Sequence, residues 1–229
     1  MHAPPESVLI IAAHQDDETI GCAGTIKKWS ALGTRVNVIF VTSGNTGIDH
    51  SGEYSSKNIV SVRDAEAQKA KEILGIASVQ CLGEGTQCVG NTQELFHEII
   101  SSIRFYRPEL VITHAPNDKH RDHRAVSDVV KEACWKANEM IHPELGVVHK
   151  IKDLWAMEIL DLLPRVDYIV DITQTYESKV EAMRAYTSQQ EIISGIFDHI
   201  DGMAKVRGYA SGCKYGEAFM RLSSVPVVM

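Results

Sequence analysis

The sequence lacks several features that would place it in other classes of protein. None of its 229 residues belong to an apolar run near the roughly 20 residues that a membrane-spanning helix needs. Lysine and arginine number 23 against 30 aspartates and glutamates, and no polybasic run occurs, which disfavours a nucleic-acid partner. Linker-like, repetitive and low-complexity tracts are also absent, so we expect a single domain over residues 1–229.

Cysteine is scarce and follows no pairing pattern. The five cysteines are scattered and form no CxxC pair, which indicates free thiols in a reducing compartment. The first residues, MHAPPESV, have neither the basic nor the apolar region of a signal peptide. From both observations we expect a cytoplasmic protein.

Short apolar runs alternate with segments of helical periodicity along the first 140 residues. The predicted strands span residues 7–13, 35–42, 79–82, 110–113, 154–159, 168–173 and 218–222. The predicted helices span residues 19–32, 59–74, 92–106, 124–138, 174–186 and 191–206. Four strand-then-helix units in a row predict an α/β fold whose mostly parallel sheet is covered by helices on both faces, in three layers. A G-x-G-x-x-G motif for a dinucleotide is absent.

Two polar segments follow predicted strands. His14-Gln15-Asp16-Asp17-Glu18 comes directly after the first strand, and His120-Arg121-Asp122-His123 follows the fourth. In open α/β sheets, loops at the carboxyl ends of different strands meet to form the site. His14, Asp17 and His123 can therefore bind one divalent metal ion, and three protein ligands with an open fourth position are typical of catalytic zinc.

The remaining polar groups of these segments suit amide hydrolysis. Asp16 lies between two predicted ligands, where its carboxylate can take a proton from water as a general base. His120 is a candidate for the acid that protonates the leaving amine, or for the group that stabilises the oxyanion. Asp122 is placed to orient an imidazole.

Structural roles compete with these functional ones. Asp16 or Asp17 can simply cap the helix that follows, and an isolated HxxH pair is more often a surface feature than a ligand pair. His114, at the end of the fourth strand, is either part of the pocket or a buried histidine with a structural partner. The loop over residues 43–58 is longer than a compact domain needs, so it can be a lid, a substrate wall carrying Asn45, or an ordinary surface loop.

The two segments resemble the A-H-P-D-D-E and H-x-D-H signatures of the PIG-L/LmbE-like de-N-acetylases. Weaker family-like pieces are Arg63-Asp64-Ala65-Glu66, Ile73-Leu74-Gly75, Arg207-Gly208 and Lys214-Tyr215-Gly216-Glu217-Ala218-Phe219. The resemblance runs from about residue 7 to about residue 222. Two departures are visible: Gln15 stands where the family usually has proline, and Asn117 or Asp118 stands where some relatives have tyrosine.

This resemblance implies a Rossmann-like fold and a zinc-dependent hydrolase that removes the acetyl group from an N-acetylglucosamine-type sugar or its conjugate. It implies the same metal ligands and general base as above, with His120 and Asp122 as their catalytic partners, and it adds Arg63 as a substrate contact. Its partner is a small acetylated molecule. Relatives are often oligomeric, so the resemblance also favours a homo-oligomer.

Three alternatives remain open at this point. The same metal can serve an amidase that acts on a thiol conjugate or another small amide. A non-catalytic ligand-binding α/β module is a different class, and the missing dinucleotide motif counts against it. The third alternative is a metal-binding protein without catalysis. The presence of Asp16 and His120 alongside the three predicted ligands counts against it. Histidine and aspartate ligands also suit Fe²⁺, Co²⁺ and Mn²⁺.

Overall fold

The computed structural model describes residues 3–45, 56–190 and 192–222. A seven-stranded sheet forms its centre, in the order β3-β2-β1-β4-β5-β7-β6, and its first five strands are parallel while β7 runs antiparallel to both neighbours. The strands are β1 (Ser7–Ala12), β2 (Arg35–Thr42), β3 (Ser78–Glu84), β4 (Leu110–His114), β5 (Asp153–Met157), β6 (Tyr168–Asp171) and β7 (Gly216–Arg221). The expected three-layer α/β fold is confirmed.

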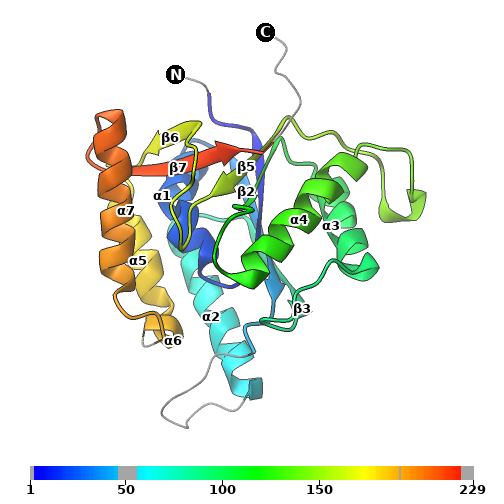
Figure 1. Ribbon diagram of the computed structural model, residues 1–229, viewed down its shortest axis with the longest axis horizontal. Helices are drawn as coiled ribbons and strands as arrows, with labels where there is room; N and C mark the ends of the chain where they lie inside the picture. Colours follow the sequence, from blue (N-terminus) through cyan, green and yellow to red (C-terminus); the bar gives the residue numbers. More distant parts are fainter. Residues whose placement is uncertain (1–2, 46–55, 191, 223–229) are drawn as a thin grey trace.

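Helices cover both faces of the sheet (Figure 1). One face carries α1 (Asp17–Ala31), α2 (Ser56–Leu74), α5 (Tyr176–Ala185) and α7 (Ile196–Ser211), and the other carries α3 (Gln93–Tyr106) and α4 (Arg121–Lys136). Two short pieces, η1 (Pro143–Leu145) and α6 (Thr187–Gln190), complete the helices of the described residues. Within β1, Val8, Ile10 and Ala12 pack into one core and the alternate residues into the other, which explains why the run is continuously apolar.

The strand order reverses at β1, and this reversal places the site. The chain leaves β1 toward β2 on one side, whereas β4 pairs with the other side of β1. The loops that follow β1 and β4 therefore leave the same edge of the sheet next to each other. Such a switch point is where ligands bind in open α/β sheets.

Three helices have boundaries that differ from the sequence-based prediction. Helix α1 begins at Asp17 rather than at residue 19, and α4 begins at Arg121 rather than at residue 124, so His123 lies in its first turn. The helix predicted over 191–206 is present but shifted along the chain, because α7 spans Ile196–Ser211. Gly195 and Gly212, with φ of 76° and 77°, flank it, because left-handed backbone ends a helix at little cost only at glycine.

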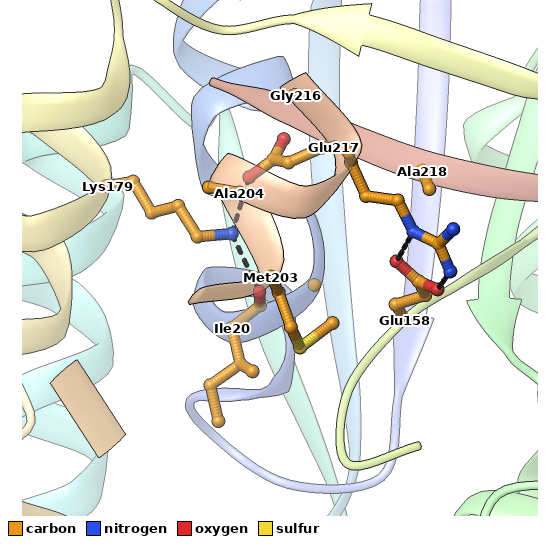
Figure 2. A pocket seen from close by; sticks show the side chains of 10 residues that line it. Ile20, Glu158, Lys179, Met203, Ala204, Gly216, Glu217 and Ala218 are labelled. Atoms are coloured by element: carbon orange, nitrogen blue, oxygen red, sulfur yellow. Dashed lines mark hydrogen bonds and ion pairs between the residues drawn. The ribbon is translucent and has the colours of Figure 1, made fainter. Parts of the chain in front are cut away.

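Helix α1 is broken at Cys22, whose φ of −152° and ψ of 20° are not helical. An unbroken helix would pair the N–H of Gly24 with the C=O of Ile20. Instead the Gly24 N–H donates to Oε1 of Glu217 at 3.0 Å, and the Lys179 ammonium donates to the Ile20 oxygen at 2.7 Å and to the same Oε1 at 2.6 Å. Figure 2 shows the Lys179 ammonium between the carboxylate of Glu217 and the carbonyl oxygen of Ile20.

Within the described residues, no helix combines the length and apolar character needed to cross a membrane.

Candidate metal centre

The three predicted metal ligands lie together at the switch point. Nδ1 of His14 is 3.3 Å from Oδ2 of Asp17 and 3.3 Å from Nε2 of His123, and that Nε2 is 3.3 Å from Oδ1 of Asp17. Ligand atoms bound tetrahedrally to zinc at about 2.0–2.1 Å lie about 3.3 Å from one another. The donor types and their spacing therefore fit a small divalent cation.

Two further histidines adjoin this trio, since the described residues contain two potential metal-binding groups that share His123. One group consists of His14, His120 and His123, and the other of Asp17, His114 and His123. His114 is fully buried and stacks on His123 with ring centroids 4.0 Å apart. Its Nε2 accepts the backbone N–H of Ala13 at 2.8 Å, so that lone pair is already used. His114 therefore packs against the ring of His123 and does not offer this nitrogen to a metal ion. Its predicted contact with a substrate stays a prediction.

A carboxylate lies beside the second nitrogen of each ligand imidazole. Nε2 of His14 lies 3.1 Å from Oδ2 of Asp122, and Nδ1 of His123 lies 3.1 Å from Oδ1 of Asp118. Such pairs fix the orientation of an imidazole and increase its basicity as a ligand. The sequence indicated this role for Asp122. It missed Asp118, although an acidic residue in the short loop between a buried strand and the second motif was an available signal.

The electrostatics of the trio favour positive charge. Burial opposes protonation of His14, but Asp17 and Asp122 outweigh it and raise its pKa to about 9. Burial likewise opposes protonation of His123, yet Asp17 and Asp118 raise its pKa to about 10. Burial alone would raise the pKa of Asp17, but the surrounding histidines hold it well below its usual range. A divalent cation would supply the same positive charge.

Asp16 lies next to the trio in a strained conformation. Its φ of 130° and ψ of −25° are rarely adopted by a residue with a side chain, and such backbone costs about 1–3 kcal/mol. Asp16 occupies the N-cap position of α1, but its side chain makes no capping hydrogen bond. A capping role therefore does not explain its conformation. Burial raises its pKa from 3.8 to about 7, with Arg63 opposing and Asp17 adding to the shift.

His120 is half-buried at the N-cap of α4, beside the ligands. Its ring centroid lies 4.7 Å from that of His14 and 4.6 Å from that of His123. Its Nδ1 accepts the backbone N–H of Asp122 at 3.2 Å, so the neutral ring carries its proton on Nε2. Burial and the two neighbouring histidines lower the pKa of His120, which favours this neutral, N–H-donating form.

The predicted substrate contacts Arg63 and Asn45 lie near the same loops. Arg63 is buried, and its Nη2 donates to the carbonyl oxygen of Gln15 at 2.6 Å. Asn45 is exposed and accepts the Thr86 N–H at 3.1 Å. Their roles toward a substrate stay predictions. Most of the loop proposed as a lid or wall falls outside the described residues.

Comparisons with known proteins agree with the motifs. A family model described as GlcNAc-PI de-N-acetylase (PIG-L) matches residues 9–134. A diacetylchitobiose deacetylase of Thermococcus kodakarensis is 29% identical over 219 residues, covering 93% of this chain and 81% of that protein.

Two solved structures share the fold. The N,N'-diacetylchitobiose deacetylase of Pyrococcus horikoshii superimposes with a TM-score of 0.85 at 24% identity, over 95% of this chain and 84% of that one. The 4-carboxy-2-hydroxymuconate hydratase of Pseudomonas putida does so with a TM-score of 0.86 at 22% identity, over 98% of both chains. Because this fold carries two chemistries, the site residues have to decide between them.

Proposed function

The chain belongs to the GlcNAc-PI de-N-acetylase (PIG-L) family, and we propose that it hydrolyses the acetamido group of an N-acetylglucosamine-type sugar or its conjugate, releasing acetate. The observation that carries this proposal is the trio His14, Asp17 and His123 at mutual distances of 3.3 Å, with the buried residue Asp16 directly before Asp17 in the chain. The family and the diacetylchitobiose deacetylase relative support an amino-sugar substrate over another small amide or a non-catalytic module.

We assign the cation to Nδ1 of His14, the carboxylate of Asp17 and Nε2 of His123. Zinc suits these donors and their spacing, and Fe²⁺ or Co²⁺ accepts the same ligand types. A cation held by these residues would polarise the acetamide carbonyl and acidify water. Asp16 would ionise more readily near it, because an opposite charge lowers the pKa of an acid.

The chain's own groups supply the proton transfers. Asp16 accepts a proton from the attacking water as its oxygen forms a bond to the acetyl carbon. The Nε2–H of His120 donates a hydrogen bond to the oxygen on which negative charge develops. The proton that Asp16 has accepted passes to the nitrogen as the C–N bond breaks. The products are acetate and the free amine. Asp122 keeps His120 in the required tautomer through its backbone N–H.

The proposal is tested with protein purified without added metal. We expect about one zinc or iron per chain by elemental analysis, and acetate release from N-acetylglucosamine or N,N'-diacetylchitobiose. Asp16→Asn should keep the metal and lower turnover by about 10²- to 10⁴-fold, because it removes the general base. Asp64→Asn, an exposed aspartate on α2, is the matched control. Absence of metal after zinc reconstitution, or full turnover by Asp16→Asn, would contradict the proposal.

A further inference from the structure

We propose that Glu18, Tyr186 and Arg63 form a clamp that sets the position of the Asp16 carboxylate, which makes them positioning residues for the proposed deacetylation. The inference rests on the role proposed for Asp16. It concerns one peptide unit, the bond between Gln15 and Asp16, whose carbonyl and N–H are both hydrogen-bonded to buried side chains.

The two ends of this peptide have different partners. The carbonyl oxygen of Gln15 accepts a hydrogen bond from Nη2 of Arg63 at 2.6 Å. The N–H of Asp16 donates to Oε2 of Glu18 at 3.2 Å. Arg63 and Glu18 are 4% and 1% exposed, so water does not compete freely for either bond. Because both the C=O and the N–H of this peptide are hydrogen-bonded, it cannot rotate without breaking one of the two bonds.

The backbone conformation of Asp16 explains why the clamp is needed. With φ of 130°, Asp16 lies in a region that a residue with a Cβ leaves readily unless its surroundings hold it. Rotation of the preceding peptide would change φ and move the Asp16 side chain away from the ligand trio. The clamp therefore acts on the direction of the carboxylate, while Asp17 and His14 hold the metal position.

Glu18 is itself held by two hydroxyl groups. Its Oε1 accepts the hydroxyl of Tyr186 at 2.7 Å and the hydroxyl of Thr19 at 2.7 Å. Tyr186 is fully buried at the end of α5, 168 residues along the chain from Glu18. A continuous hydrogen-bonded path therefore runs from Tyr186 through Glu18 to the backbone of Asp16.

Arg63 is held by the shape of its surroundings. A Cβ added to Gly44 would lie 2.6 Å from Cδ of Arg63, so a glycine at the end of β2 makes room for the guanidinium. Nη2 of Arg63 also lies 3.8 Å from Oδ1 of Asp16. Arg63 thus contacts the carbonyl of the clamped peptide and the carboxylate that the peptide orients.

Tyr186→Phe tests the clamp with the smallest change, because it removes one hydroxyl and keeps the buried ring. We expect the Asp16 amide hydrogen to exchange with solvent about tenfold faster or more, measured in the purified full chain. The matched control is Tyr176→Phe on the same helix, which loses a 2.9 Å hydroxyl–carboxylate bond to Asp201 and has no link to Asp16. Unchanged exchange at Asp16 in Tyr186→Phe would overturn the clamp, whether or not the protein is an active deacetylase.

Kinetics then separate positioning from general destabilisation. We expect Tyr186→Phe to lower kcat roughly three- to tenfold with KM and metal content unchanged, because ground-state binding does not use Asp16. In the Asp16→Asn background the same substitution should cause no further loss, since its effect passes through that carboxylate. An equal loss in both backgrounds would overturn the positioning role. A wild-type protein that releases no acetate would contradict the proposed function alone, and the amide exchange would still decide the clamp.

Discussion

Oδ1 of Asp118 lies 3.1 Å from Nδ1 of His123, the ring nitrogen that does not face the other ligands. The same carboxylate is held by the backbone N–H of His120 at 2.8 Å, so one buried side chain organises both histidines of the second motif.

Asp118→Asn should weaken metal binding. The substitution removes the negative charge that orients His123 and strengthens it as a ligand, and loss of such a partner typically costs about 10- to 100-fold in affinity. Competition between the protein and a chromophoric chelator for zinc measures the change. Asp128→Asn, an exposed aspartate on the same helix as His123, should bind zinc like the wild type. Equal affinity for Asp118→Asn and wild type would show that Asp118 does not support the ligand.

Zinc should raise the thermal stability of the wild type and of Asp16→Asn, but not of Asp17→Ala. A ligand that binds only the folded state, at about a thousand times its Kd, stabilises by about 4 kcal/mol. Asp16 is assigned to proton transfer, so its loss should leave this shift intact. Calorimetric scans of each variant with zinc and with chelator give the comparison. A normal shift in Asp17→Ala would remove Asp17 from the ligand set.

The parts of the site that the sequence predicted are those that local patterns determine. The continuous apolar run of β1 identifies a strand buried on both faces, and polar residues directly after it lie at the sheet edge. His14, Asp17 and His123 were therefore correctly expected to lie close together at this edge, although Asp17 and His123 lie in the first turns of α1 and α4 and the roles of all three stay proposals.

The missed contacts join residues that are far apart in the chain. The hydroxyl of Tyr186 hydrogen-bonds Glu18, which lies 168 positions earlier in the chain. The ammonium of Lys179 pairs with the carboxylate of Glu217 beside the break in α1. Hydrophobic periodicity contains no information about such polar partners, because it reports only which face of an element is buried. The boundaries of α7 were missed for a local reason, since Gly195 interrupts a run whose periodicity continues on both sides.

Lys179→Met should destabilise the fold strongly. It leaves the carboxylate of Glu217 buried without its cation and the carbonyl of Ile20 without a donor, and removal of one partner of a buried pair costs about 3–5 kcal/mol. Urea unfolding followed by circular dichroism measures the loss. The control is Lys205→Met, because the Lys205–Asp201 pair has the same 2.6 Å separation but is solvent-exposed. Similar midpoints for Lys179→Met and Lys205→Met would mean that the bridge across α1 adds little to stability.

Arg104 should resist even a conservative substitution. It is buried on α3, and its guanidinium donates, among the residues that the structure describes, to carbonyl oxygens at and beyond the end of α4. These belong to Lys136, Ala137, Glu139, Ile141, His142 and Gly146. Lysine lacks the planar fork that reaches several carbonyls at once, so Arg104→Lys should lower the free energy of unfolding by about 2 kcal/mol or more. Arg107→Lys, at an exposed position with one 3.4 Å bond to Val148, is the control in the same urea titration. Equal unfolding free energies for the two variants would show that the carbonyl cluster needs only a positive charge and not the guanidinium geometry.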